Sequence, residues 1–183
     1  MRIISGKFRG KIIRAPESLP VRPTTDIAKE ALFNWLAFRV DFETIHAMDL
    51  FAGTGNITYE LLSRGTERIV CVDKHPACIR FISDTVKKLD ATKSVELYNT
   101  DTVIALERVR STFDVIFADP PFDYPDHKKV IESILSKRLL KEDGWLIVEH
   151  PASVKLQDVA GFSENRHYGK VNFSFFQLPE IIA

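Results

Sequence analysis

A chain of 183 residues, 45% hydrophobic and 27% charged, can bury one sizeable core but is too short for two ordinary domains, so we expect one domain over residues 1–183. Its 25 basic and 25 acidic residues cancel, which argues against a strongly basic polyanion binder. Charges recur throughout the opening residues and the longest apolar runs are strand-sized. We therefore expect neither a secretory signal nor a membrane span, but a cytoplasmic monomer.

The first 25 residues are basic, since six Lys and Arg residues stand against one acidic residue, Glu17. This asymmetry indicates a phosphate-contacting face, and a merely solvated charged surface is the alternative. Segments 2–5 and 11–14 flank a turn region at 6–10 and predict a β-hairpin extension, and an apolar stripe predicts a helix over 25–37. The basic residues are Arg2, Lys7, Arg9, Lys11, Arg14 and Arg22.

Between residues 45 and 149, short apolar runs alternate with turn residues and stretches of helical spacing, a pattern typical of βαβ units. We expect an α/β fold with a mostly parallel sheet, helices on both faces and a C-terminal antiparallel hairpin over 162–168 and 171–178. The expected strands are 45–49, 68–73, 95–99, 114–118 and 145–149. The expected helices are 57–63, 76–89, 102–109 and 128–135.

A turn with Gly53 and Gly55 follows the first expected strand, which ends at Asp49. Glycine lets the backbone approach a ligand closely, and the helix that follows points N–H groups at the same place. The third glycine of the dinucleotide fingerprint is replaced by Thr58, so a pyrophosphate fits poorly. S-adenosylmethionine has no pyrophosphate, and Asp49 and the loop backbone could hold its amino and carboxylate groups.

Two further acidic residues follow the next strands at the same edge of the sheet. Asp73 ends the second strand, where a carboxylate can accept both ribose hydroxyls, and Asp101 after the third could accept from an adenine amino group. Phe51 or Lys74 would border the cleft. A lone Gly-x-Gly turn often only tightens a junction, but acidic residues at successive strand ends favour a cofactor site.

The strongest motif is Asp119-Pro120-Pro121-Phe122, directly after an apolar strand. The two prolines stiffen the backbone and donate no hydrogen bond there, so the loop presents carbonyl oxygens and the Asp119 carboxylate as acceptors. An aromatic amine needs such acceptors, because its lone pair is delocalised until the nitrogen becomes more tetrahedral. Phe122 could stack on the base, and Tyr124 could line its pocket. The structural alternative is an Asp-Pro pair that only ends a strand.

These residues resemble the RsmD-like methyltransferases, which modify the N2 amine of a guanine in bacterial small-subunit (16S) ribosomal RNA. The basic N-terminal segments are the narrower markers, whereas the glycine and Asp-Pro-Pro motifs occur in many amino-methyltransferases. The matching segments are RIISGKFRG at 2–10, VRPTTD at 21–26, EALFNWL at 30–36, DLFAGTG at 49–55 and DPPF at 119–122.

The resemblance implies a Rossmann-like class I methyltransferase fold, S-adenosylmethionine as methyl donor and RNA presented on a ribosomal particle. Cys71 and Cys78 have no second Cys or His pair at ligand spacing, so we expect no metal. Three alternatives remain: a DNA methyltransferase acting on adenine N6 or cytosine N4, a nicotinamide-dependent oxidoreductase, and a non-catalytic RNA-binding or ribosome assembly factor.

Overall fold

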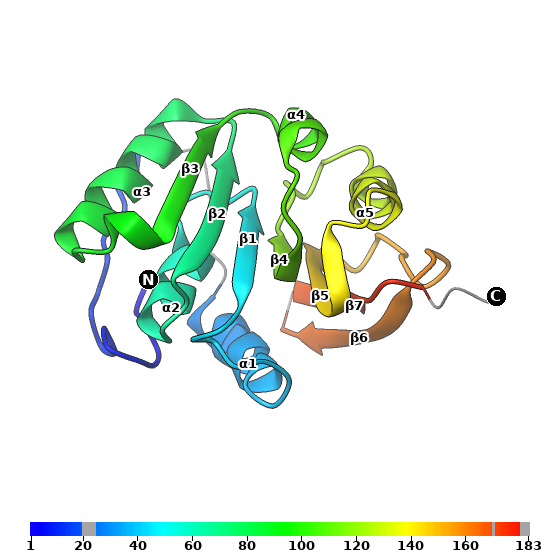
Figure 1. Cartoon of the computed structure of the whole chain (residues 1–183), viewed down its shortest axis with the longest axis horizontal. Coiled ribbons are helices and arrows are strands. Elements are labelled where there is room, and N and C mark those ends of the chain that lie inside the picture. Colours follow the sequence, from blue (N-terminus) through cyan, green and yellow to red (C-terminus); the bar gives the residue numbers. More distant parts are fainter. Residues whose placement is uncertain (20–24, 170, 180–183) are drawn as a thin grey trace.

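The computed structural model describes residues 1–19, 25–169 and 171–179, within which seven strands form one sheet in the order β3-β2-β1-β4-β5-β7-β6 (Figure 1). The neighbouring pairs among β1 to β5 are parallel, and β7 is antiparallel to both β5 and β6. The mostly parallel sheet and the C-terminal hairpin are confirmed. The strands are β1 His46–Leu50, β2 Arg68–Asp73, β3 Val95–Asn99, β4 Phe113–Ala118, β5 Leu140–His150, β6 Phe162–Tyr168 and β7 Val171–Phe176.

The helices begin where the sequence supplies capping groups. Thr25 accepts a hydrogen bond from the Ala28 amide at the start of the first helix, and Asp101 accepts one from the Val103 amide at the start of the helix over 102–108. Pro76 occupies the first turn of the helix over 76–88, where no N–H is needed. The helices are α1 Asp26–Leu36, α2 Asn56–Ser63, α3 Pro76–Lys88, α4 Thr102–Arg108 and α5 His127–Ser136, with a short 3₁₀ helix at Thr92–Ser94.

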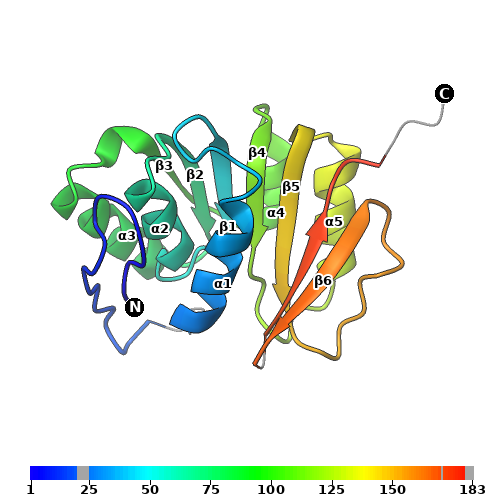
Figure 2. The same cartoon turned by 90° about the horizontal axis from the view of Figure 1, so that it is seen from below.

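Helices cover both faces of the sheet (Figure 2), and each face buries a separate apolar cluster. Side chains alternate along each strand, so Ala47 of β1 packs toward α1, α2 and α3, and its neighbour Met48 packs toward α4 and α5. Asp49 follows in this alternation and shares the α2 face. The helices on both faces leave the carboxyl ends of the parallel strands as one continuous edge, and the functional motifs follow that edge.

Residues 1–13, called here the N-terminal loop, fold back on themselves beside α2 (Figures 1 and 2). The expected hairpin is paired at its ends, where the Ile3 and Ile13 amides donate to the Lys11 and Met1 carbonyls around an antiparallel bridge between Arg2 and Ile12. Between these ends it opens, because the amides of Ile4, Ser5 and Phe8 donate to side chains of α2. The strand expected at 145–149 is also longer than predicted, because β5 already begins at Leu140.

Among the described residues, none of the helices combines the length and the apolar character needed to cross a bilayer.

Candidate active site

The site lies where β1 and β4 end next to each other. Leu50, the last residue of β1, pairs with Ala118, the last residue of β4, and the Asp119 amide donates to the Leu50 carbonyl at 3.3 Å. Two segments leave the sheet here: residues 51–55, called the glycine bend, and residues 119–122, called the proline turn. The structure thus brings together the two motifs that stood out in the sequence, at the edge where open α/β sheets bind ligands.

The glycine bend is tight, because three of its residues have positive φ: Phe51 at 59°, Gly53 at 54° and Gly55 at 79°. A Cβ on Gly55 would also lie 2.8 Å from the Tyr59 ring and 2.9 Å from the Ile82 side chain. Glycine is therefore required at residue 55 by both conformation and space.

Asp49 lies beneath the bend and is held by Thr58. Its Oδ2 accepts from the Thr58 amide at 3.1 Å and from the Thr58 hydroxyl at 2.6 Å. Burial raises the pKa of Asp49 to about 7, while the Thr58 hydrogen bonds oppose the rise and the charge of Asp73 adds to it. The sequence pattern identified Thr58 only as a departure from the dinucleotide fingerprint. The sequence did contain a sign of the hydrogen bond between Thr58 and Asp49: a hydroxyl residue in the first turn of the helix that follows an acidic residue at the end of a strand.

Asp73 connects the end of β2 to the glycine bend. Its Oδ2 accepts from the Gly53 amide at 2.8 Å, and its Oδ1 accepts from the His75 amide at 2.7 Å. Each carboxylate oxygen can accept a further hydrogen bond, so Asp73 could still receive two ribose hydroxyls. Lys74 beside it is exposed, and its carbonyl accepts from the Asn99 side chain at 3.0 Å.

Two loops meet at Tyr124. Its ring packs edge-on against Phe51, with centroids 5.3 Å apart. Burial raises the pKa of Tyr124, and the negative charges of Asp101 and Asp126 add to the rise. Asp101 itself is exposed and accepts from the Val103 amide at 2.9 Å. Tyr124 therefore borders the glycine bend as well as the proline turn, whereas the sequence assigned it to the RNA side alone.

The proline turn presents a carboxyl group and an exposed aromatic ring. Burial raises the pKa of Asp119 well above its usual value, and the nearby charges of Glu149 and Asp49 add to the rise. Pro120 is buried and Pro121 exposed, with the Pro121 carbonyl accepting from the Tyr124 amide at 2.8 Å. Phe122 is 62% exposed. The turn can thus offer hydrogen-bond acceptors beside a flat apolar surface.

The N-terminal loop lies close to the same edge. The Thr54 hydroxyl of the glycine bend contacts the Met1 sulfur at 3.5 Å, and a cavity of about 420 Å³ lies between Thr54, Met1 and residues 13–19. The five described basic side chains are exposed, and none of them forms an ion pair within the described part of the chain. They are Arg2, Lys7, Arg9, Lys11 and Arg14; Arg22 lies outside the described residues.

The metal prediction was made from spacing alone. In the part of the chain that the structure describes, no group of three or more His, Cys, Asp or Glu side chains could hold a metal ion. Cys71 and Cys78 are both buried free thiols, and burial raises the pKa of each. Cys71 packs in the apolar cluster on the face of the sheet that α1, α2 and α3 cover.

Two curated relatives resemble this chain over most of its length. A Bacillus subtilis protein named "Putative rRNA methyltransferase YlbH" is 36% identical over 164 residues, which is 88% of each chain. The Escherichia coli K12 protein named "Ribosomal RNA small subunit methyltransferase D" is 32% identical over 150 residues, covering 81% of this chain and 71% of the relative.

Solved structures share the fold. The putative methyltransferase yhhF from Escherichia coli superposes with a TM-score of 0.82 at 26% identity, covering 98% of both chains. An RNA methyltransferase from Salinibacter ruber, solved with S-adenosyl-L-homocysteine, superposes with a TM-score of 0.69 at 16% identity, covering 88% of this chain and 97% of the other. The fold is thus the Rossmann-like class I methyltransferase fold that the resemblance implied. A family model described as "Conserved hypothetical protein 95" matches residues 1–177, and the chain belongs to this RsmD-like family.

Proposed function

We propose that this protein is an S-adenosylmethionine-dependent methyltransferase that modifies the exocyclic N2 amine of a guanine in small-subunit (16S) ribosomal RNA. The observation that carries the proposal is the pairing of Leu50 with Ala118, which sets the glycine bend beside the proline turn. A methyl donor held at the bend then faces an amine held at the turn. The relatives named as rRNA methyltransferases support ribosomal RNA as the substrate.

The residues at the bend fit S-adenosylmethionine in shape and in charge. The positive φ of Gly53 and Gly55 turns the chain sharply into α2, and Asp73 has acceptor capacity left for the ribose hydroxyls. A cationic ligand stabilises the ionised forms of Asp49 and Asp119, whose carboxyl groups are otherwise driven toward protonation by burial. S-adenosylmethionine, when bound, supplies an electrophilic methyl group on a sulfonium.

The outer part of the cofactor site is assigned to three further residues. Phe51 offers an aromatic surface for the adenine, and Asp101 at the start of α4 offers an acceptor for the adenine amino group. Lys74, exposed after β2, borders the ribose side. In this arrangement Tyr124 lies between the cofactor and the target base. One side of its ring faces the glycine bend, and the other side is left to contact the RNA base.

The proline turn binds and orients the amine. The Asp119 carboxylate and the Pro120 carbonyl accept the two amine hydrogens, since neither proline has an N–H to donate. This favours the tetrahedral nitrogen geometry in which the lone pair is free to attack. Pro121 stiffens the turn, and the exposed Phe122 ring stacks on the base. After transfer the proton passes to solvent, so no dedicated base is needed.

Positioning supplies most of the rate enhancement in this mechanism. The target guanine must leave its stack, which costs a few kcal/mol. Alignment of two reactants can lower a barrier by about 7 to 11 kcal/mol in favourable cases. The protein therefore needs further contacts with the RNA to offset the unstacking.

We assign those contacts to the basic N-terminal residues, because their charges are exposed next to the site. Phosphate contacts of this kind position a nucleic acid and make its binding sensitive to salt. The residues are Arg2, Lys7, Arg9, Lys11, Arg14 and Arg22. The proposal includes a monomeric cytoplasmic enzyme, without metal, that acts on RNA within a ribosomal particle.

A labelling experiment tests the function. The protein is incubated with labelled S-adenosylmethionine and separate pools of unmodified small-subunit RNA, small-subunit particles and DNA, and the labelled nucleoside is identified by mass spectrometry. We expect N2-methylguanosine, with the particle as the better substrate. Labelled N6-methyladenine or N4-methylcytosine in DNA would replace the proposal with a DNA methyltransferase, and no label in any pool would favour a non-catalytic RNA-binding factor.

A further inference from the structure

Polar side chains on α2 are buried although their spacing is typical of a solvent-facing stripe. Asn56, Glu60 and Ser63 follow one another at about one helical turn, and none is more than 5% exposed. The N-terminal loop lies over this stripe. Buried polar groups need hydrogen-bond partners, and the backbone of the N-terminal loop supplies those of Glu60 and Ser63.

Glu60 anchors the first part of the loop. Its two carboxylate oxygens accept from the Ile4 amide at 2.8 Å and from the Ser5 amide at 3.1 Å. Two cations balance its charge, with the Arg64 Nε at 2.9 Å and the Lys29 Nζ at 3.7 Å. A buried carboxylate tolerates no loss of such partners, so Glu60 fixes where the loop chain must run.

Ser63 anchors the second part of the loop. Its hydroxyl accepts from the Phe8 amide at 2.9 Å and donates to the Ser5 carbonyl, and its own carbonyl accepts from the Lys7 amide at 2.7 Å. Gly6 lies between these contacts with φ at 79°, and a Cβ there would be 1.7 Å from the Ser63 carbonyl oxygen. Only glycine lets the loop lie this close to the end of α2.

Lys29 connects the loop to the beginning of the same helix. Its ammonium group donates to the Arg2 carbonyl and to the Asn56 side chain, both at 2.7 Å. Asn56 directly follows the glycine bend, where Thr54 contacts Met1. The N-terminal loop is therefore attached both to the beginning and to the end of α2. The beginning of α2 directly follows the glycine bend, where the methyl donor is proposed to bind.

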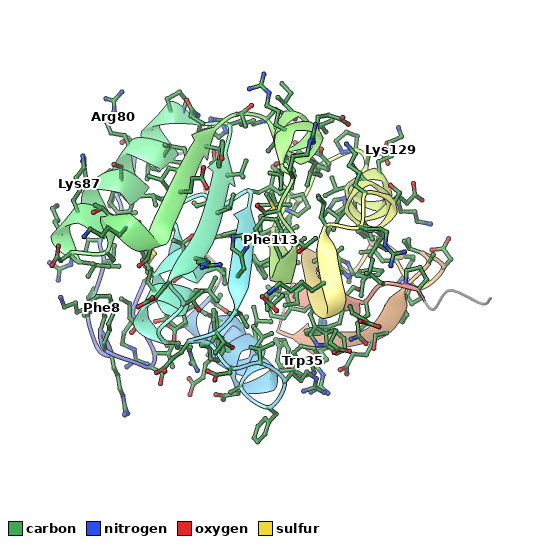
Figure 3. All side chains as sticks on the ribbon, viewed as in Figure 1. Phe8, Trp35, Arg80, Lys87, Phe113 and Lys129 are labelled. Carbon is green, nitrogen blue, oxygen red and sulfur yellow. The ribbon has the colours of Figure 1, made fainter. Side chains whose placement is uncertain are left out.

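The exposed tip of the loop carries the cations. The ammonium groups of Lys7 and Lys11 lie 5.0 and 5.1 Å from the centre of the Phe8 ring, and Arg9 is exposed between them. Phe8 lies at the outer edge of the molecule (Figure 3). Because its backbone is bonded to α2, the tip is held in one place before any RNA arrives.

We propose that the docking of the N-terminal loop on α2 positions the RNA relative to the methyl donor, and that Gly6, Glu60 and Ser63 are positioning residues for the methyl transfer. The inference rests on the proposed function, in which the loop cations contact RNA phosphates. An undocked loop keeps its charges, so it still attracts RNA with the same dependence on salt. It no longer holds the target base in line, and misplacement of about 1 Å can cost on the order of 100-fold in rate.

Two glycine substitutions separate docking from backbone strain. Gly6→Ala and Gly10→Ala both place alanine at a positive φ, 79° and 83°, but a Cβ on Gly10 meets nothing within 4 Å. We expect Gly6→Ala to lower kcat/KM for the RNA substrate roughly tenfold or more relative to Gly10→Ala. Both variants should bind S-adenosylmethionine like the unchanged protein, measured by calorimetry, and both should keep its salt dependence of RNA binding.

Two further variants test the docking of the loop and its contact with RNA separately. Glu60→Gln retains the shape but turns an NH₂ group toward one of the two loop amides, so it should give a loss of the same kind as Gly6→Ala. Equal kcat/KM for the two alanine variants would overturn the inference, as would a loss in Gly6→Ala matched by an equal loss of cofactor affinity, since that indicates general unfolding. If Lys11→Glu leaves RNA binding unchanged, the RNA contact in the proposed function is wrong, which the glycine pair alone would not reveal.

Discussion

The glycine bend and the proline turn differ in how far the protein has already satisfied their polar groups. The carboxyl groups of Asp49 and Asp73 accept hydrogen bonds from backbone amides around the bend. At the turn, burial and the charges of Glu149 and Asp49 act on the Asp119 carboxyl, and Phe122 is largely exposed. The carboxyl groups of the donor half are therefore held in place by the backbone before a ligand binds, whereas the acceptor half presents a carboxyl group and an exposed ring to the target base.

Replacing Asp119 gives the largest expected effect on this comparison. Asp119→Ala removes an acceptor that acts on the amine in the transition state, and we expect kcat to fall about 100-fold or more. The affinity for S-adenosylmethionine should fall much less than kcat, because Asp119 adds only its nearby charge and the bend keeps its contacts. Single-turnover methyl transfer and calorimetry measure the two quantities, and Asn at the same position, which keeps a carbonyl, should be less damaging. A parallel loss of cofactor affinity would contradict the division between the two halves.

Phe122 tests the acceptor half in a second way. Removing a stacked aromatic ring costs about 1 to 3 kcal/mol per base, so Phe122→Ala should raise the KM for RNA by roughly 5- to 150-fold. The matched control is Phe38→Ala, because Phe38 is also exposed, at 90%, but follows α1 away from both motifs. Equal KM values for the two variants would remove Phe122 from the base site.

Gly55 tests the donor half. Gly55→Ala forces a Cβ against Tyr59 and Ile82 at a positive φ, and we expect the affinity for S-adenosylmethionine to fall roughly tenfold, in line with about 1 to 2 kcal/mol of backbone strain. Gly169→Ala is the control, since its φ is also positive, at 64°, and nothing lies within 4 Å of its Cβ. Thermal melting of both variants shows whether the loss is local. Should the two variants bind the cofactor alike, the bend would tolerate a side chain after all.

Local signals explain why the order of elements could be predicted. Apolar runs bounded by turn residues marked all five parallel strands. Once the strands are known to be parallel, the acidic residues near their carboxyl ends, such as Asp49 and Asp73, must lie at the same edge of the sheet. The meeting of the bend with the proline turn also follows, because it needs only β1 and β4 to be neighbours in the usual doubly wound order.

Contacts between distant segments could not be predicted in this way. Ser5 and Ser63 are 58 residues apart, and nothing local indicates that the polar stripe of α2 is covered by the N-terminal loop rather than by water. The same limit applies to Tyr124, whose contact with Phe51 depends on how two loops pack. The roles assigned to the site residues stay predictions, since geometry places side chains together without showing what they bind.

The pH dependence of cofactor binding gives a smaller effect on the donor half. Burial raises the pKa of Asp49 to about 7, and a cation binds its ionised form better. The affinity for S-adenosylmethionine should therefore be full above that pH and fall up to about tenfold per pH unit below it. Calorimetry between about pH 5.5 and 8.5 measures this affinity on both sides of the midpoint. S-adenosylhomocysteine lacks the sulfonium charge but keeps the amino group that Asp49 is proposed to hold, so it should show the same dependence.

Thr58→Val gives the smallest and most specific shift. The Thr58 hydroxyl donates to Asp49 and so favours the ionised carboxylate, and its removal should raise the pKa of Asp49 further. The fall in cofactor affinity should then begin at a higher pH, by roughly half to one unit, which corresponds to the net value of one hydrogen bond. Thr58→Ser keeps the hydroxyl and should leave the midpoint in place. Because Thr58 contacts Asp49 and not the proline turn, kcat at high pH should be unaffected in Thr58→Val. If the midpoint for cofactor binding stays fixed or moves to lower pH, another group, such as Asp119, governs the titration.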